Sequence, residues 1–243
     1  MASYTPTVSL DDPTTSTGGN GHNPPHHHGG DDFGPSFFDV RLRRARLGLV
    51  VGLTGIVMIF ISFSSAYVVR QGLPTLDPRT DVLLHDWFPV PLPRLLLINT
   101  AVLLISSLTM EIARRQAARK AALARLASVP GVSMHAKEEV SWLALTVVLG
   151  LSFLTGQWMA WRELAASGFY VASSPSSSFV YLLTGMHGVH LFGGVVALLT
   201  AGAASLLRRP ADSQAIAVDV TGWYWHFMAF LWVYILCLLE FVH

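Results

Sequence analysis

The chain has 243 residues, of which 52% are hydrophobic and only 13% are charged. Soluble domains carry about 25% charged residues, so this composition, with a mean hydropathy of +0.48, predicts a polytopic membrane protein. A formal net charge of +1 argues against a nucleic-acid-binding protein, which needs a concentrated basic face. The single cysteine, Cys237, excludes an internal disulfide framework and a multi-cysteine metal site.

Residues 1 to about 40 are rich in Thr, Ser, Gly, Pro, Asp and His. This segment has too little apolar surface to offset the entropy lost on ordering, so we expect a disordered cytoplasmic tail. Its histidine run could bind a transition metal weakly, although a solvated tail is the favoured interpretation; the residues are His22, His26, His27, His28, Asp31 and Asp32. Four arginines then form a basic collar typical of a membrane surface, namely Arg41, Arg43, Arg44 and Arg46.

Five apolar stretches follow, and each approaches or exceeds the roughly 20 residues that cross a bilayer as a helix. They cover residues 47–69, 92–110, 140–161, 179–207 and 220–239. The fold class is therefore predicted to be all-α, with five transmembrane helices. In the first stretch, small residues repeat on one side and predict a face for close helix packing; they are Gly48, Gly52, Gly55, Ser62 and Ala66.

The basic residues between these stretches predict the orientation, because Lys and Arg favour the cytoplasmic side. With the N-terminus inside, that side holds twelve of the sixteen basic residues, and the other side holds Arg70, Arg79, Arg94 and Arg162. We therefore expect the N-terminus in the cytoplasm and the C-terminus outside. The linker from Arg114 to Ser128 reads as a basic, Ala-rich helix on the cytoplasmic surface.

Few polar residues lie inside the spans, and histidines stand out among them. Thr184, His187, His190 and Gly194 recur at intervals of three or four and share one helix face, while His226 lies beside Trp225 in the last span. Facing lipid would cost each imidazole several kcal/mol, so these side chains should face protein.

Three interpretations of the histidines are open. They can form hydrogen bonds between helices with Thr184, Trp225 or a backbone carbonyl, they can bind a metal, or two of them can ligate haem. Hydrogen bonding is favoured, because the sequence offers no intramembrane carboxylate to orient the imidazoles as metal ligands. An ion or proton transporter acting alone is disfavoured, since the cores of the first three spans hold no Asp, Glu, Lys or Arg.

Two long motifs resemble those of a known family. LLTGMHGVHLFGG resembles the T-G-x-H-G-x-H-x-x-G-G signature of subunit III of haem-copper cytochrome c oxidases, and DVTGWYWHFMAFLWVYIL resembles its closing Y-W-H-F-x-D-x-x-W helix. FISFSSAYVVRQG and LGLSFLTGQWMAWRELAASG are similar to two further segments of that family. The resemblance covers residues 42–243, and five spans match the shorter bacterial members.

The resemblance implies five helices in two bundles, two plus three, with a phospholipid-holding cleft between them. It implies no catalytic, metal-binding or cofactor-binding residue in this chain, because the haems and the copper belong to the partner subunit I. Five residues are expected to hold the helices together, namely Thr184, His187, His190, Trp225 and His226. Four more are expected to contact lipid or headgroups, namely Tyr67, Arg70, Trp158 and Glu163.

Two positions depart from the family pattern. Ile56 stands where many members carry an intramembrane glutamate, and Ala229 stands where the last motif usually has Asp. We therefore expect no proton-handling role for this chain.

The expected function is that of a non-catalytic subunit III of an aerobic respiratory cytochrome c oxidase in a bacterial plasma membrane. The chain would stabilise subunit I and bind structural phospholipid, within a complex that reduces oxygen to water. One alternative is subunit III of a quinol oxidase. Another, from a different class, is a stand-alone haem-binding membrane oxidoreductase that uses His187 or His190 with His226.

Overall fold

The computed structural model describes residues 37–76, 83–84, 87, 93–127, 141–171, 173–207 and 210–241. Five helices account for most of them: α1 (Phe37–Gln71), α2 (Leu95–Ala127), α3 (Trp142–Ala166), α4 (Pro175–Leu206) and α5 (Ala211–Phe241). Two short strands, β1 (Thr75–Leu76) and β2 (Leu83–Leu84), pair antiparallel after α1. Residues 1–36 of the predicted tail, with all of its histidines, lie outside the described residues, so the predicted disorder and weak metal binding stay predictions.

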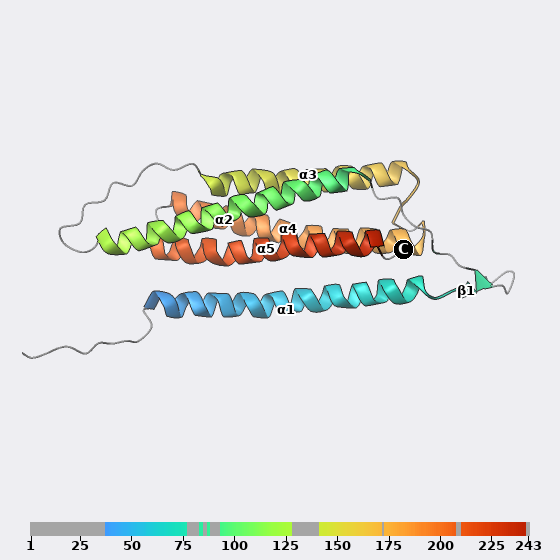
Figure 1. Cartoon of the computed structure of the whole chain (residues 1–243), viewed down its shortest axis with the longest axis horizontal. Coiled ribbons are helices and arrows are strands. Elements are labelled where there is room, and N and C mark those ends of the chain that lie inside the picture. The colour runs from blue at the N-terminus through green and yellow to red at the C-terminus, as the bar shows by residue number, and fades with distance from the viewer. Residues whose placement is uncertain are drawn as a thin grey trace, which may run out of the picture. The chain divides into compact units, whose positions relative to one another are not determined.

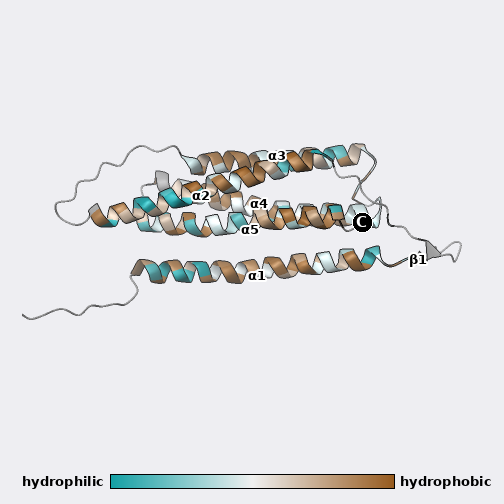
Figure 2. Cartoon of the chain, in the orientation of Figure 1, coloured by the Kyte–Doolittle hydropathy of each residue, from teal (hydrophilic) through white to brown (hydrophobic). Residues whose placement is uncertain are grey.

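All five helices are long and apolar enough to cross a membrane, which confirms the predicted all-α, five-span architecture. Successive helices run in opposite directions, so the N-terminal ends of α1, α3 and α5 lie beside the C-terminal ends of α2 and α4 (Figure 1). Hydrophilic residues gather at this shared end, on the start of α1 and the last part of α2 (Figure 2).

Several helices extend beyond the predicted apolar spans. α1 begins at Phe37 rather than residue 47 and includes the last four residues of the predicted tail, and α5 begins at Ala211 rather than residue 220. The linker from Arg114 continues α2 as far as Ala127 rather than forming a separate surface helix. Apolar residues mark only the part of a helix that crosses the lipid. Ala-rich segments can continue the helix beyond it, because alanine has a high helix propensity and one face of the segment packs against protein. In α5, Ala215 and Val218 are buried in this added part.

Local sequence explains two helix ends on the same side of the bundle. Pro175 occupies the first turn of α4, where its missing N–H costs nothing. The Ser174 hydroxyl accepts a hydrogen bond from the Ser177 N–H at 3.2 Å, and the Ser177 hydroxyl accepts one from the Ser174 N–H at 3.1 Å, a reciprocal cap. α3 ends where Gly168 adopts a φ of 89°, a conformation that favours glycine.

The helices associate unevenly. α2 packs against α3 and α5, and α4 packs against α5 and α3, so these four form one group. Within the described residues, the backbone of α1 lies close to those of α5 and α4, and the Arg125 side chain of α2 reaches the Phe38 ring of α1. The predicted division into two plus three helices is therefore not confirmed, because the polar and small side chains of α2 face α3 and α5 rather than α1.

α1 is the least enclosed helix. Its buried side chains are Phe60, Ser64 and Tyr67, all in its second half. A Cβ added at Gly48, Gly52 or Gly55 would meet nothing within 4 Å in the described chain. The predicted close-packing face of α1 is thus not used within this part of the chain.

Candidate functional site

Trp225 forms the centre of the four-helix group. Its side chain is fully buried, and its indole N–H donates to the Ser106 hydroxyl of α2 at 3.1 Å. The ring approaches glycines on two other helices: a Cβ built on Gly150 of α3 would lie 2.7 Å from Cη2, and one built on Gly194 of α4 would lie 3.2 Å from Cζ3. Trp225 therefore contacts α2, α3 and α4 from α5.

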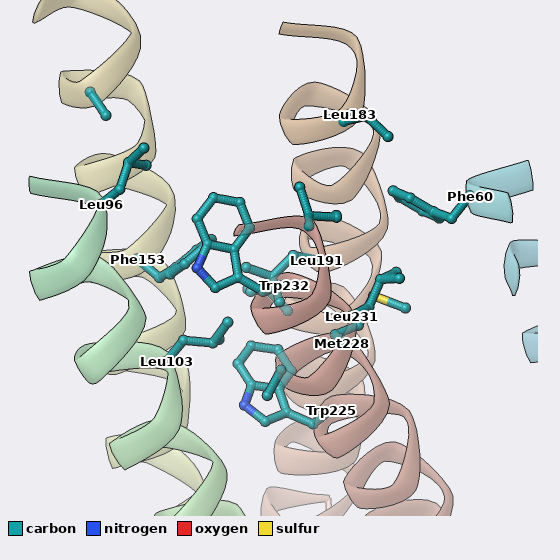
Figure 3. Close-up of a cluster of buried hydrophobic side chains, with 14 of the residues drawn as sticks. Phe60, Leu96, Leu103, Phe153, Leu183, Leu191, Trp225, Met228, Leu231 and Trp232 are labelled. Carbon is teal, nitrogen blue, oxygen red and sulfur yellow. The ribbon is translucent and has the colours of Figure 1, made fainter. Parts of the chain in front are cut away.

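A second tryptophan repeats this arrangement two turns along α5. Trp232 donates its indole N–H to the Thr100 hydroxyl at 2.9 Å and meets Phe153 edge-on at 5.0 Å between ring centroids. Figure 3 shows both indole nitrogens turned toward α2, with Leu103 and Phe153 beside them. These two indoles thus fill the interior with their only polar atoms hydrogen-bonded.

Polar side chains connect α2 to α3. Asn99 donates to the Phe153 carbonyl at 3.1 Å, and its Oδ1 lies so close to Gly156 of α3 that an added Cβ would force the Asn99 side chain to move. The hydroxyls of Thr109 and Thr146 lie 2.9 Å apart. These buried hydrogen bonds explain why α2 lies against α3.

His187 is fully buried but makes no hydrogen bond within the described residues. Neither ring nitrogen has a partner, and the ring lies 5.0 Å from Trp232 and 6.0 Å from Phe153 between centroids. Gln157 Oε1 also lacks a partner in this part of the chain. His187 thus contributes to packing between helices, but the expected hydrogen bond is not among its contacts.

Thr184, one turn before His187, joins α4 to α3. It accepts a hydrogen bond from the Trp161 indole N–H at 3.1 Å. Tyr181 adds a second link through its hydroxyl, which donates to the Phe169 carbonyl at 3.0 Å. The predicted interhelical role of Thr184 therefore involves Trp161 rather than a histidine.

His190 lies on the side of α4 that faces α1. Its Nδ1 is 2.8 Å from the Met186 carbonyl of its own helix, and its ring meets Phe60 of α1 at 5.9 Å. The interhelical hydrogen bond at this position uses the backbone, because the Tyr224 hydroxyl donates to the His190 carbonyl at 2.8 Å.

His226 lies between a hydroxyl and a carboxylate of α2. Its Nδ1 is hydrogen-bonded to the Ser107 hydroxyl, and its Nε2 lies 3.5 Å from Glu111 Oε2. Glu111 lies just past the second predicted apolar span, 92–110, so the carboxylate that reaches His226 of α5 comes from the end of a span.

Glu111 belongs to a cluster of charges at the end of the bundle where α1 begins. We call this the ion-pair cluster; it consists of Arg46, Glu111, Arg114, Arg115 and Asp219. Asp219 of α5 accepts from Arg46 of α1 at 2.8 and 3.0 Å and from Arg114 of α2 at 3.1 Å. A single carboxylate thus joins three helices.

A second ion pair lies farther along the same end. Arg125 donates to Asp212 at 2.9 Å and stacks on the ring of Phe38, with its guanidinium carbon 4.0 Å from the ring centroid. It therefore bridges the ends of α2, α5 and α1.

Sequence reasoning missed Asp219 and Asp212. Both residues precede the last apolar span, on the side of the membrane where most Lys and Arg residues were expected. This position could have predicted that they form ion pairs.

The four predicted lipid contacts have different environments. Trp158 is 62% exposed and Glu163 is exposed, so both present surface beside the end of α3. Arg70 donates to the Leu73 carbonyl at 3.1 Å. Tyr67 is only 3% exposed and packs against Trp87 and Phe179. Little of the Tyr67 ring is left for a lipid, so this residue fits protein packing better.

The three histidines do not converge. His187 packs against Trp232, His190 against Phe60, and His226 against Ser107. Within the described residues no group of three or more His, Cys, Asp or Glu could hold a metal ion. This arrangement suits the joining of helices, and a haem between His226 and either other ring would require the aromatic packing around them to be rebuilt.

The model of the family described as Cytochrome c oxidase subunit III matches residues 39–242. The chain belongs to this family. It is similar to the probable cytochrome c oxidase subunit 3 of Mycobacterium leprae (strain TN), with 28% identity over 198 residues that cover 81% of this chain and 87% of the relative. It is also similar to the probable cytochrome c oxidase subunit 3 of Nocardia farcinica (strain IFM 10152), with 26% identity over 203 residues that cover 81% of this chain and 87% of the relative. The cytochrome c oxidase subunit 3 of Danio rerio is 28% identical over 195 residues, 78% of this chain and 66% of the relative.

The family resemblance drawn from the motifs is thereby confirmed. Within this subunit III fold, the two positions that depart from the pattern are packing positions. Ile56 is half-buried against the core, and Ala229 is 3% exposed on α5. Both side chains fill apolar space and offer no group that could exchange a proton.

Proposed function

We propose that this member of the subunit III family is a non-catalytic subunit of an aerobic respiratory oxidase, in a bacterial plasma membrane. It stabilises the haem- and copper-bearing subunit I and holds structural phospholipid. The names of the similar proteins favour cytochrome c over a quinol as the electron donor of the complex. The mycobacterial and nocardial relatives favour the bacterial membrane.

The packing around Trp225 is the observation that carries this proposal. One indole is hydrogen-bonded to α2 and pressed against glycines of α3 and α4, so the four helices form a rigid unit. A rigid unit can support a neighbouring subunit. Among the described residues, α1 leaves a long apolar surface uncovered, with Val51 67% and Met58 63% exposed. Such surface in a membrane is covered by lipid or by another subunit.

Purification of the tagged full chain in mild detergent tests the subunit role. We expect a haem- and copper-bearing partner to co-purify, and His187→Ala and His226→Ala to lower the haem recovered per chain without moving its absorption bands. The chain freed of partners should show no Soret band. A Soret band that stays with the isolated chain and disappears in His226→Ala would instead establish a haem protein.

Phospholipid extraction from the same preparation tests the lipid role. Trp158→Ala should lower the number of retained phospholipids, because an interfacial indole contacts the headgroup region. Phe230→Ala is the matched control, since Phe230 is 73% exposed on another helix. Equal retention in both variants would contradict a specific role for Trp158.

A further inference from the structure

A groove opens between α2, α3, α4 and α5 at the end of the bundle that carries the ion-pair cluster. Its volume is about 800 Å³, within the range of about 300–1,000 Å³ that is typical of small-molecule sites. This groove lies at the opposite helix ends from Arg70, Trp158 and Glu163, so it is distinct from the lipid contacts proposed above.

The lining of the groove changes from polar to apolar along its length. On α2 the lining runs from Lys120, seven residues before the helix ends at Ala127, to Ala113 farther in, and on α3 it runs from Ser141 to Val148. Seven residues of helix separate the ends of each series, a length of about 10 Å. The groove is therefore polar at its mouth and apolar in its depth, like a phospholipid.

The mouth of the groove offers positive charge. Arg114, Arg115 and Arg125 on α2 already pair with carboxylates. Lys120, in contrast, forms no ion pair with any carboxylate in the described part of the chain. An ammonium group at the membrane surface attracts an anionic headgroup.

The groove is also open sideways to the surroundings of the bundle. Val148 is 57% exposed and Leu199 is 53% exposed, and both line it. In a bilayer these side chains face hydrocarbon, so an acyl chain can enter from the membrane without crossing water.

We infer that this groove binds one anionic phospholipid, with its phosphate at Lys120 and its acyl chains along Val148 and Leu199. This inference goes beyond the proposed subunit role and does not depend on the partner. A lipid bound in this way would be preferred for its negative charge. A helix of another subunit that filled the groove through apolar contacts would show no such preference.

Native mass spectrometry of the full chain with its co-purifying partners tests the inference, using added phosphatidylglycerol and phosphatidylcholine. Phosphatidylglycerol should bind in preference to phosphatidylcholine, and Lys120→Gln should weaken its binding roughly fivefold. Arg119→Gln is the matched control: Arg119 is the exposed neighbouring cation on α2 and does not line the groove. Equal weakening by both variants would indicate diffuse surface attraction and overturn the site.

Filling the groove gives an independent test. Ala144→Phe, from the lining of α3, should abolish the binding of both lipids, whereas Ala101→Phe on the exposed surface of α2 should leave it unchanged. Leu199→Trp serves the same purpose from α4 if Ala144→Phe does not fold. Unchanged lipid binding in folded variants would mean that something else occupies the groove, and the inference would be wrong. Haem recovery from the same samples reports separately on the subunit role.

Discussion

Trp225 depends on two residues that have no side chain. The space for its ring exists because Gly150 and Gly194 let the backbones of α3 and α4 approach it. The sequence predicted an interhelical role for Trp225, but not these partners, because contacts between residues so far apart along the chain leave no local pattern. The aromatic packing of His187 was missed for the same reason.

Gly150→Ala is expected to destabilise the fold. The added methyl would lie 2.7 Å from Trp225 Cη2, and such overpacking costs about 1–3 kcal/mol. Gly188→Ala is the control, because its methyl would meet nothing within 4 Å in the described chain. Thermal unfolding in detergent should show a lower midpoint for Gly150→Ala only, and equal midpoints would mean that α3 moves away without cost.

His187 offers a test of packing against polarity. His187→Ala should lose about 2–4 kcal/mol through the cavity it leaves. His187→Leu should be more stable than His187→Ala by at least about 1 kcal/mol, because it restores the volume and removes a buried polar ring that has no partner. Denaturation in detergent measures the unfolding free energy of both variants. Equal losses of stability would reveal that His187 has a hydrogen-bond partner outside the described residues.

At the scale of elements, Asp219 holds α1 to the rest of the bundle at the end that carries the ion-pair cluster. Its bidentate pair with Arg46 joins α5 to α1, and its contact with Arg114 adds α2. Bidentate pairs with restricted geometry are stronger than most surface pairs. The helix ends themselves were harder to predict than the spans, since the extensions of α1 and α5 are marked by amphipathic packing rather than by apolarity.

Asp219→Asn should loosen the first turns of α1. We expect faster hydrogen exchange around Arg46 and a loss of about 1–2 kcal/mol, because the Arg46 guanidinium loses its carboxylate partner and Arg114 keeps only Glu111. Asp212→Asn is the control: its carboxylate is 41% exposed, and an exposed pair contributes at most about 1 kcal/mol. If both variants exchange alike, α1 is held by its apolar contacts alone.

At the scale of the whole molecule, five antiparallel helices place the two ends of the described chain on opposite faces of a membrane. The number of helices and their order could be predicted from apolar length, since that signal is local. Their grouping could not, because it depends on which polar faces meet, as Asn99 meets α3 and Ser106 meets Trp225.

Reporter fusions test the predicted orientation. With the N-terminus inside, alkaline phosphatase fused after the last helix should be active and green fluorescent protein fused there should be dark. The reason is that the arginines of the ion-pair cluster and Arg125 lie at one end of the bundle, and basic residues stay in the cytoplasm. The reverse pattern would show that the N-terminus is outside.

The contacts of α1 also bear on how the protein is made. Within the described residues, the helix synthesised first lies closest to the last two, α4 and α5. During translation, α1 therefore lacks most of its helix contacts until α4 and α5 have been synthesised. A nascent chain halted before α5 would lack the Arg46–Asp219 pair and most of the close contacts of its first helix, so insertion of α5 should complete the docking of α1.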